Sequence, residues 1–253
     1  MCEIKLEILT NLETLSRWVA NWMLDLTTAK EGIFTVCLSG GSTPRRLYER
    51  LADPSYLEAF PWSRTHWFWG DERLVPHDDV LSNYRMAREA LLSHAPIPAI
   101  NIHPIPTEGL SPEAAASAYE HELKSFYGAG HLDPARPLFD LTFLGLGPDG
   151  HAASLFPGSS LLAERGRWVA AAVGIKPEAR IMLLFPRAPK QPAGSLSDRG
   201  GREARHLRTT SPRQSESAGR AFISDRRAMA LCRCGGRIQL PLGGGPSCEW
   251  RPS

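Results

Sequence analysis

The sequence lacks any apolar run of the roughly 18–20 residues that a membrane-spanning helix requires. Its first segment, MCEIKLEILT, also lacks the cationic start and apolar core of a secretory signal peptide. Cysteine is scarce, and its five residues are scattered: Cys2, Cys37, Cys232, Cys234 and Cys248. These absences predict a cytoplasmic protein with no disulfide framework and no membrane partner.

Metal-ligand spacing is absent as well. No two CxxC pairs occur, and His, Asp and Glu form no cluster typical of a metal centre. We therefore expect no metal site.

Residues 187–253 contain no Val and no Tyr, whereas Arg, Gly, Ser and Pro supply 35 of the 67 positions. This segment has 13 basic and 5 acidic residues, a net charge of +8, whereas residues 1–186 have 16 and 22, a net charge of −6. The composition predicts irregular structure after residue 186. Its arginines are scattered and almost no aromatic residues lie between them, so we expect no nucleic-acid partner.

Residues 1–186 alternate buried-strand and helix patterns. Apolar residues recur at helical spacing over 11–26, and 112–127 has the composition of a helix, while 33–38, 65–69 and 139–144 are short apolar runs that end in glycine turns. Further strand candidates are 168–173 and 180–185. This order predicts an α/β fold with a doubly wound, mostly parallel, Rossmann-like sheet, helices on both faces, and a ligand site at the carboxyl ends of the strands.

The segment Ser39–Thr43 (SGGST) lies between the first of these strands and a helix expected to have Thr43 as N-cap and Pro44 as first residue. Ser39, Ser42 and Thr43 supply hydroxyl donors, and Gly40 and Gly41 allow close backbone approach, as phosphate binding requires. It is neither a Walker A loop nor a GxGxxG dinucleotide loop. A plain strand-to-helix turn is the alternative.

Polar residues also follow the next two strands. Asp71, Glu72 and Arg73 come directly after the strand 65–69, where a guanidinium can hold a phosphate or an oxyanion; a surface ion-pair cluster is the alternative. Asp149 and His151 lie in a glycine-rich turn after the strand 139–144. Histidine titrates near neutral pH, so His151 is the candidate general base, with Asp149 able to fix its tautomer.

Three long segments and a looser fourth together resemble the 6-phosphogluconolactonase family, which is related to the glucosamine-6-phosphate deaminases and isomerases. They are LSGGSTPRRLYERLA (38–52), HWFWGDERLVPHDDVLSNYRMA (66–87), FDLTFLGLGPDGHAASLFPGS (139–159) and VGIKPEARIMLLFP (173–186). The resemblance covers about residues 5–186. It implies one lactonase-like α/β domain over 1–186, incomplete at its C-terminal side, and a non-family tail over 187–253.

The resemblance implies hydrolysis of 6-phospho-D-glucono-1,5-lactone to 6-phosphogluconate, in the oxidative pentose phosphate pathway, without a metal or organic cofactor. By this resemblance His151 activates water and Asp149 orients it, while Arg73 assists the substrate or the developing oxyanion. The Ser39–Thr43 loop binds the 6-phosphate, with Arg180 as a second phosphate contact and Asp71 near the substrate. The expected partner is a small sugar-phosphate lactone, and the expected oligomeric state is a monomer.

Two other functions remain open at this point. One is a glucosamine-6-phosphate isomerase or deaminase activity, in which Asp71 would accept the first proton. The other is an inactive sugar-phosphate-binding protein, altered by its C-terminal segment.

The composition of 187–253 is typical of a GC-rich coding sequence that is translated out of frame. We therefore predict a frameshift near codons 186–195, in the gene or in its sequencing. Resequencing that DNA should show an alternative frame that continues the family pattern. An intact frame with no better continuation in either other frame would refute this prediction.

Overall fold

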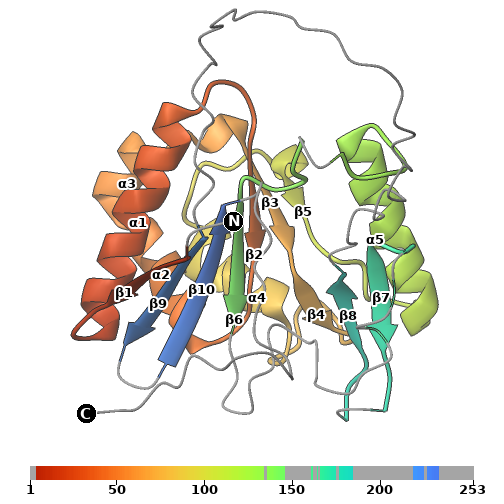
Figure 1. The fold of residues 1–253 in the computed structure, drawn as a ribbon. Helices are drawn as coiled ribbons and strands as arrows, with labels where there is room; N and C mark the ends of the chain where they lie inside the picture. The colour runs from red at the N-terminus through yellow and green to blue at the C-terminus, as the bar shows by residue number, and fades with distance from the viewer. Residues whose placement is uncertain are drawn as a thin grey trace, which may run out of the picture.

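The computed structural model describes residues 4–133, 136–145, 161, 164, 166–174, 177–184, 219–224 and 227–233. Its main element is a seven-stranded sheet with the order β1-β9-β10-β6-β2-β3-β5 (Figure 1). The strands are β1 (Ile4–Ile8), β9 (Gly219–Ser224), β10 (Arg227–Arg233), β6 (Leu141–Gly145), β2 (Phe34–Leu38), β3 (Thr65–Trp69) and β5 (Ile102–His103). All pairings are parallel except the two that β10 makes, so the predicted mostly parallel sheet is confirmed.

Five α-helices accompany this sheet in the described part of the chain: α1 (Leu12–Ala29), α2 (Ser42–Leu51), α3 (Pro54–Ala59), α4 (Asn83–Ala87) and α5 (Pro112–Tyr127). Helix α4 continues into a π-helical turn at Arg88–Leu92, and single 3-10 turns lie at Trp62–Arg64 and Ala99–Asn101. None of the described helices combines the length and the apolar character that crossing a membrane requires.

Strand β3 shows that helices cover both faces of the sheet. Successive side chains of a strand point to opposite faces. Phe68 packs on Phe126 of α5, with ring centroids 4.9 Å apart, whereas Trp67 packs on Phe60 at the end of α3, at 6.0 Å. Both faces of β2 are buried as well, which is why its sequence FTVCL is apolar without alternation.

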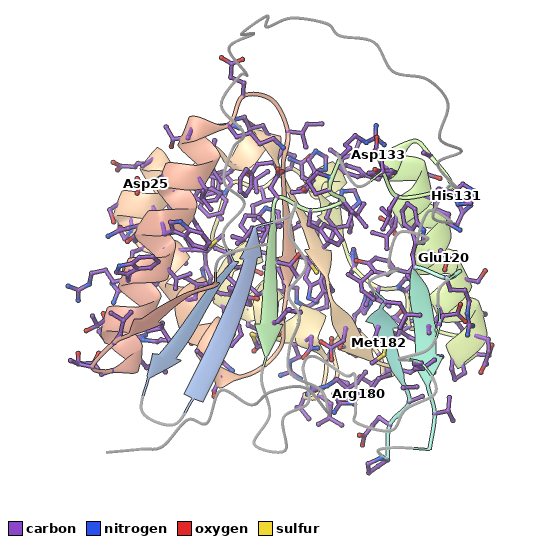
Figure 2. All side chains as sticks on the ribbon, viewed as in Figure 1. Asp25, Glu120, His131, Asp133, Arg180 and Met182 are labelled. Atoms are coloured by element: carbon purple, nitrogen blue, oxygen red, sulfur yellow. The ribbon has the colours of Figure 1, made fainter. Side chains whose placement is uncertain are left out.

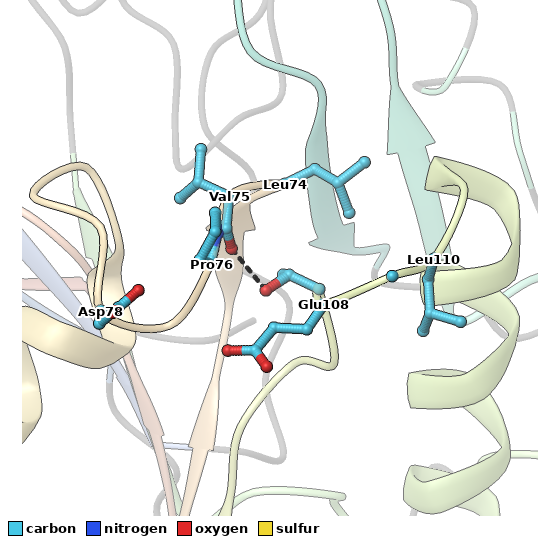
Figure 3. A pocket seen from close by; sticks show the side chains of 8 residues that line it. Leu74, Val75, Pro76, Asp78, Glu108 and Leu110 are labelled. Carbon is cyan, nitrogen blue, oxygen red and sulfur yellow. Dashed lines mark hydrogen bonds between the residues drawn. The ribbon is translucent and has the colours of Figure 1, made fainter.

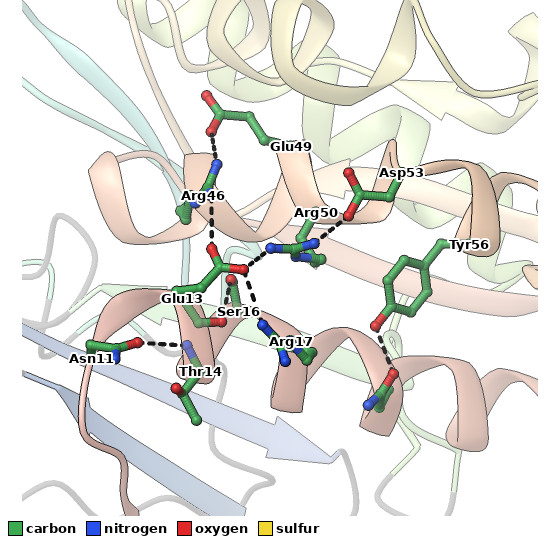
Figure 4. Close-up of polar contacts among 11 residues, drawn as sticks. Asn11, Glu13, Thr14, Ser16, Arg17, Arg46, Glu49, Arg50, Asp53 and Tyr56 are labelled. Carbon is green, nitrogen blue, oxygen red and sulfur yellow. Dashed lines mark hydrogen bonds and ion pairs between the residues drawn. The ribbon is translucent and has the colours of Figure 1, made fainter.

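Charged side chains join α1 to α2. Glu13 of α1 forms ion pairs with Arg46, at 2.7 Å, and with Arg50 of α2, and Arg50 also pairs with Asp53 (Figure 4). Each such half-exposed pair contributes little on its own. Most of the stabilisation at this contact comes from buried apolar residues such as Val19 and Leu47, and the ion pairs add orientation.

A second, three-stranded antiparallel sheet lies beside the first, with the order β4-β8-β7. Its strands are β4 (Asp71–Arg73), β8 (Arg180–Leu183) and β7 (Val169–Ala172). The predicted strands 168–173 and 180–185 are confirmed as β7 and β8, although they pair in this separate sheet. The predicted turn after β3 is wrong for residues 71–73, which form β4. Gly70 accepts a hydrogen bond from Leu183 at 2.8 Å, so the chain passes from β3 directly into the small sheet.

The prediction that residues 187–253 are irregular is wrong for β9 and β10. These strands contain short apolar runs, AFI and AMALC, that the average composition concealed. They lie between β1 and β6, where each neighbour offers unpaired backbone N–H and C=O groups to a strand. Backbone pairing therefore outweighs the poor strand propensity of the surrounding composition. The frameshift stays a prediction.

Two buried tyrosines each form two hydrogen bonds with the backbone of one residue at the carboxyl end of a strand. We call each such arrangement a tyrosine clamp. The Tyr119 hydroxyl of α5 accepts from the Trp69 amide at 3.0 Å and donates to the Trp69 carbonyl at 3.1 Å. The Tyr48 hydroxyl of α2 does the same at Ser39, at 3.0 and 2.9 Å. Burial raises the pKa of both phenols, so both remain neutral donors.

We expect Tyr119→Phe to lower the free energy of unfolding by about 1–3 kcal/mol, because it leaves a buried amide and carbonyl of Trp69 without their partner. Urea unfolding measures this loss. Tyr84→Phe, at a half-buried tyrosine outside the clamp, is the matched control. Equal stability losses in the two variants would contradict the role of the clamp.

Candidate active site

The carboxyl ends of three parallel strands meet at one edge of the main sheet. In the ladders, Leu38 of β2 pairs with Trp69 of β3, and Cys37 pairs with Thr142 of β6. The chain therefore leaves β2, β3 and β6 at Ser39, Gly70 and Gly145 on the same edge. A Cβ atom placed on Gly145 would lie 3.6 Å from the Ser39 Oγ, so the end of β6 touches the segment that follows β2.

The glycine loop Ser39–Thr43 leads from β2 into α2. Gly41 is the N-cap of α2 and has φ = 109°, a left-handed conformation that favours glycine. The predicted helix start was two residues late, because α2 begins at Ser42, with Gly41 rather than Thr43 as N-cap.

Glycine leaves this N-terminus without a side-chain cap. The caps of three other helices, Asn11, Ser82 and Ser111, each accept a hydrogen bond from a first-turn amide. Gly41 has no side chain to do so. The positive end of the α2 dipole thus faces the site without a competing oxygen from its own cap, which suits an anionic ligand.

Two guanidinium groups lie beside this edge of the sheet. Arg73 of β4 and Arg180 of β8 are directly paired in the antiparallel ladder. Arg180 is 3.7 Å from the Asp71 carboxylate, and Arg73 donates to the Leu81 carbonyl at 2.5 Å. Figure 2 shows Arg180 at the end of the molecule toward which β6 points.

Charged groups of both signs act on Arg180. Burial lowers the pKa of Arg180, and the neighbouring Arg73 lowers it further, whereas Asp71, Glu178 and Glu72 oppose both effects. An anion bound between the arginines would relieve their repulsion and form charge-assisted hydrogen bonds.

Glu72 has a structural position that the sequence did not indicate. Its side chain is 1% exposed, and its two oxygens accept hydrogen bonds from the amides of Arg73, Asn83 and Tyr84, at 2.7–2.8 Å, and from the Ser82 hydroxyl, at 3.1 Å. Burial raises the pKa of Glu72, and the four hydrogen bonds oppose that shift. This carboxylate therefore holds the start of α4 instead of facing a ligand.

Asn83 is a site residue that sequence reasoning missed. Its buried amide donates to the Asp71 carbonyl at 2.9 Å and lies against Gly40 of the glycine loop. In the sequence Asn83 is only one residue of the family-like segment 66–87, and nothing in that segment indicates contact with a loop 43 positions earlier.

The structure brings most of the predicted site residues together. Through Asn83, Gly40 is joined to Asp71, which pairs with Arg180 beside Arg73. Ser39, Gly41, Ser42 and Thr43 belong to the same glycine loop. His151 and Asp149, the predicted base and its orienting carboxylate, lie outside the described residues.

A separate hollow opens between the loop after β4 and the segment before α5 (Figure 3). Its lining residues are Leu74, Val75, Pro76, Asp78, Thr107, Glu108, Gly109 and Leu110. Thr107 donates to the Val75 carbonyl at 2.6 Å and joins its two sides. None of the predicted site residues lines this hollow.

A test of Glu72 follows from its raised pKa. In the folded protein Glu72 takes up a proton at a pH where an unfolded glutamate is still ionised. Its contribution therefore makes the free energy of unfolding fall as pH rises from the unfolded pKa through the folded pKa.

We expect Glu72→Gln to remove this component of the pH dependence and, at neutral pH, to cost about 1–3 kcal/mol, since its amide nitrogen would face backbone N–H donors. Urea unfolding at a series of pH values upward from about 4 measures both effects. A variant with the wild-type free energy of unfolding and the wild-type dependence of that free energy on pH would contradict this assignment. Glu113→Gln, at an exposed position, is the control.

Comparisons with known proteins identify the family of this chain. A 6-phosphogluconolactonase from Synechocystis sp. is 50% identical over 143 residues, which cover 56% of this chain and 56% of that protein. A chloroplastic protein from Oryza sativa subsp. indica, described as a probable 6-phosphogluconolactonase, is 43% identical over 180 residues, which cover 69% of this chain and 54% of that protein. The chain thus spans little more than half the length of these relatives.

Solved structures give the same fold. The 6-phosphogluconolactonase from Trypanosoma cruzi superposes with a TM-score of 0.62 at 32% identity, over 72% of this chain and 74% of that one. The enzyme of that name from Thermotoga maritima gives 0.58 at 34% identity, over 72% and 77%. The model of the family of glucosamine-6-phosphate isomerases and 6-phosphogluconolactonases matches residues 11–188, and the chain belongs to this family.

Proposed function

We propose that this chain hydrolyses 6-phospho-D-glucono-1,5-lactone to 6-phosphogluconate, in the cytoplasm and as a monomer. The observation that carries the proposal is the pair of guanidinium groups, Arg73 and Arg180, which face each other in the β4–β8 ladder next to a helix N-terminus that has no side-chain cap. A substrate with one phosphate and one carbonyl that becomes an oxyanion meets both requirements of such a site. Relatives named 6-phosphogluconolactonase support this choice of substrate.

In this proposal the phosphate binds at the glycine loop. Backbone amides at the start of α2 and the hydroxyls of Ser39, Ser42 and Thr43 donate to its oxygens, and Arg180 supplies the second, charged contact. Asp71 holds Arg180 in place through their ion pair.

The reaction is an acyl transfer to water. His151 takes a proton from a water molecule, whose oxygen bonds to the lactone carbonyl carbon, while Asp149 orients the imidazole. Arg73 stabilises the negative charge that develops on the carbonyl oxygen. The bond from that carbon to the ring oxygen then breaks, the ring oxygen takes up the proton, and the product is a carboxylic acid that ionises at neutral pH.

The deaminase or isomerase alternative needs Asp71 as a proton acceptor. Its carboxylate is within ion-pair distance of Arg180 and 3.5 Å from the Asn83 amide nitrogen. These contacts hold the Asp71 carboxylate against a cation, a role that the lactonase proposal uses to place Arg180. Ammonia release from glucosamine 6-phosphate would support the alternative.

We expect His151→Ala to lower kcat for the phosphorylated lactone by roughly a hundredfold to ten-thousandfold, because general base catalysis contributes on that order. The assay follows acid release and subtracts spontaneous hydrolysis. His94→Ala, at an exposed histidine, should retain wild-type turnover. A His151→Ala variant as active as wild type would overturn the assigned base; a wild-type chain with no turnover would overturn the proposed function.

A further inference from the structure

The Asn83 side chain fills the space between the glycine loop and β4. It is 3% exposed, although its amide group is polar. A Cβ atom placed on Gly40 would lie 2.0 Å from the Asn83 Oδ1 and 2.5 Å from its Cγ, far inside contact distance. The backbone of the loop therefore rests directly on the Asn83 amide, and Gly40 is the residue that permits this approach.

The other side of the same amide group is held by β4. Its nitrogen donates to the Asp71 carbonyl at 2.9 Å and lies 3.5 Å from the Asp71 carboxylate. One planar group thus contacts the loop on one side and the Asp71 residue that pairs with Arg180 on the other.

Asn83 cannot easily move away from this position. Its own backbone amide donates to the buried Glu72 carboxylate at 2.7 Å, and Ser82 before it caps α4 and donates to the same carboxylate. A shift of Asn83 would break hydrogen bonds of a buried charge, which is costly.

We infer that Asn83 is a positioning residue that sets the separation between the glycine loop and the Arg73–Arg180 pair. This inference rests on the proposed function, because it takes both elements to bind one phosphorylated substrate. The side chain contacts neither guanidinium in the described contacts, and it acts through Gly40 and Asp71. Asparagine suits the position because it combines a donor for the Asp71 carbonyl with a flat, uncharged surface for the loop.

The test measures binding of 6-phosphogluconate by calorimetry, which needs no turnover. We expect Asn83→Ala to weaken binding on the order of tenfold to a hundredfold, since the loss of one hydrogen bond to a charged ligand group weakens binding by about that factor. Asn101→Ala is the matched control. Asn101 is also 3% exposed and donates to a backbone carbonyl, of Ser63 at 3.0 Å, but lies outside the site. It should keep wild-type affinity while losing comparable thermal stability.

A double-mutant cycle separates positioning from general destabilisation. Gly40→Ala alone should weaken 6-phosphogluconate binding, because its Cβ would clash with the amide. In the Asn83→Ala background Gly40→Ala should weaken 6-phosphogluconate binding much less, since the side-chain atoms that would clash with the new Cβ are absent. Additive losses, or wild-type affinity in Asn83→Ala, would overturn the inference. If Asn83→Ala does not fold, Asn83→Asp keeps the shape and replaces the donor by a carboxylate near Asp71; wild-type affinity in that variant would also overturn it.

Failure of the proposed function gives a different result. A wild-type chain that binds 6-phosphogluconate but does not hydrolyse the lactone would refute the proposed activity and leave the Asn83 coupling intact. A wild-type chain that hydrolyses the lactone, with no coupling between positions 40 and 83, would refute the inference alone.

Discussion

The buried Glu72 carboxylate is the constraint on which the described site depends. A charge that is 1% exposed is tolerated in a protein only where hydrogen bonds replace its water, and four donors do so here. Three of them are backbone amides, two of which belong to the first residues of α4. The start of α4 must therefore lie next to β4 in space, and this places the Asn83 side chain against Gly40.

The two tyrosine clamps add to this constraint from opposite sides of the sheet. Tyr48 holds the peptide at Ser39, and Tyr119 holds the peptide at Trp69, which fixes the points where the chain leaves β2 and β3. Because Leu38 and Trp69 are paired in the ladder, both exits lie at the same height. The site is thus built on rigid strand ends, while its polar groups come from the segments that follow them.

The pattern of apolar residues was sufficient to predict the helices and strands whose sequence reflects how deeply they are buried. The continuous apolar run of β2, the helical spacing of α1, the helical composition of α5, and the order of strands and helices all predicted the parallel α/β arrangement, which the structure confirms. The same reasoning failed for β4, because three polar residues after a glycine are typical of a turn. Their strand conformation comes from pairing with β8, more than 100 positions later. Likewise, β9 and β10 are strands because their backbones pair with β1 and β6, between which they lie.

The sequence by itself determined which residues we predict to carry chemistry: the glycine loop, Asp71, Arg73 and Arg180 were all selected from residue type and from their place after a strand or within a family motif. Residue type limits what a side chain can donate, accept or charge, and this information is local. The tertiary structure alone decided how the two acids after β3 divide their roles, with Asp71 toward Arg180 and Glu72 buried as a support for α4. It also decided that Asn83 joins the loop to β4. Burial and contact between distant segments depend on packing, which no local pattern encodes.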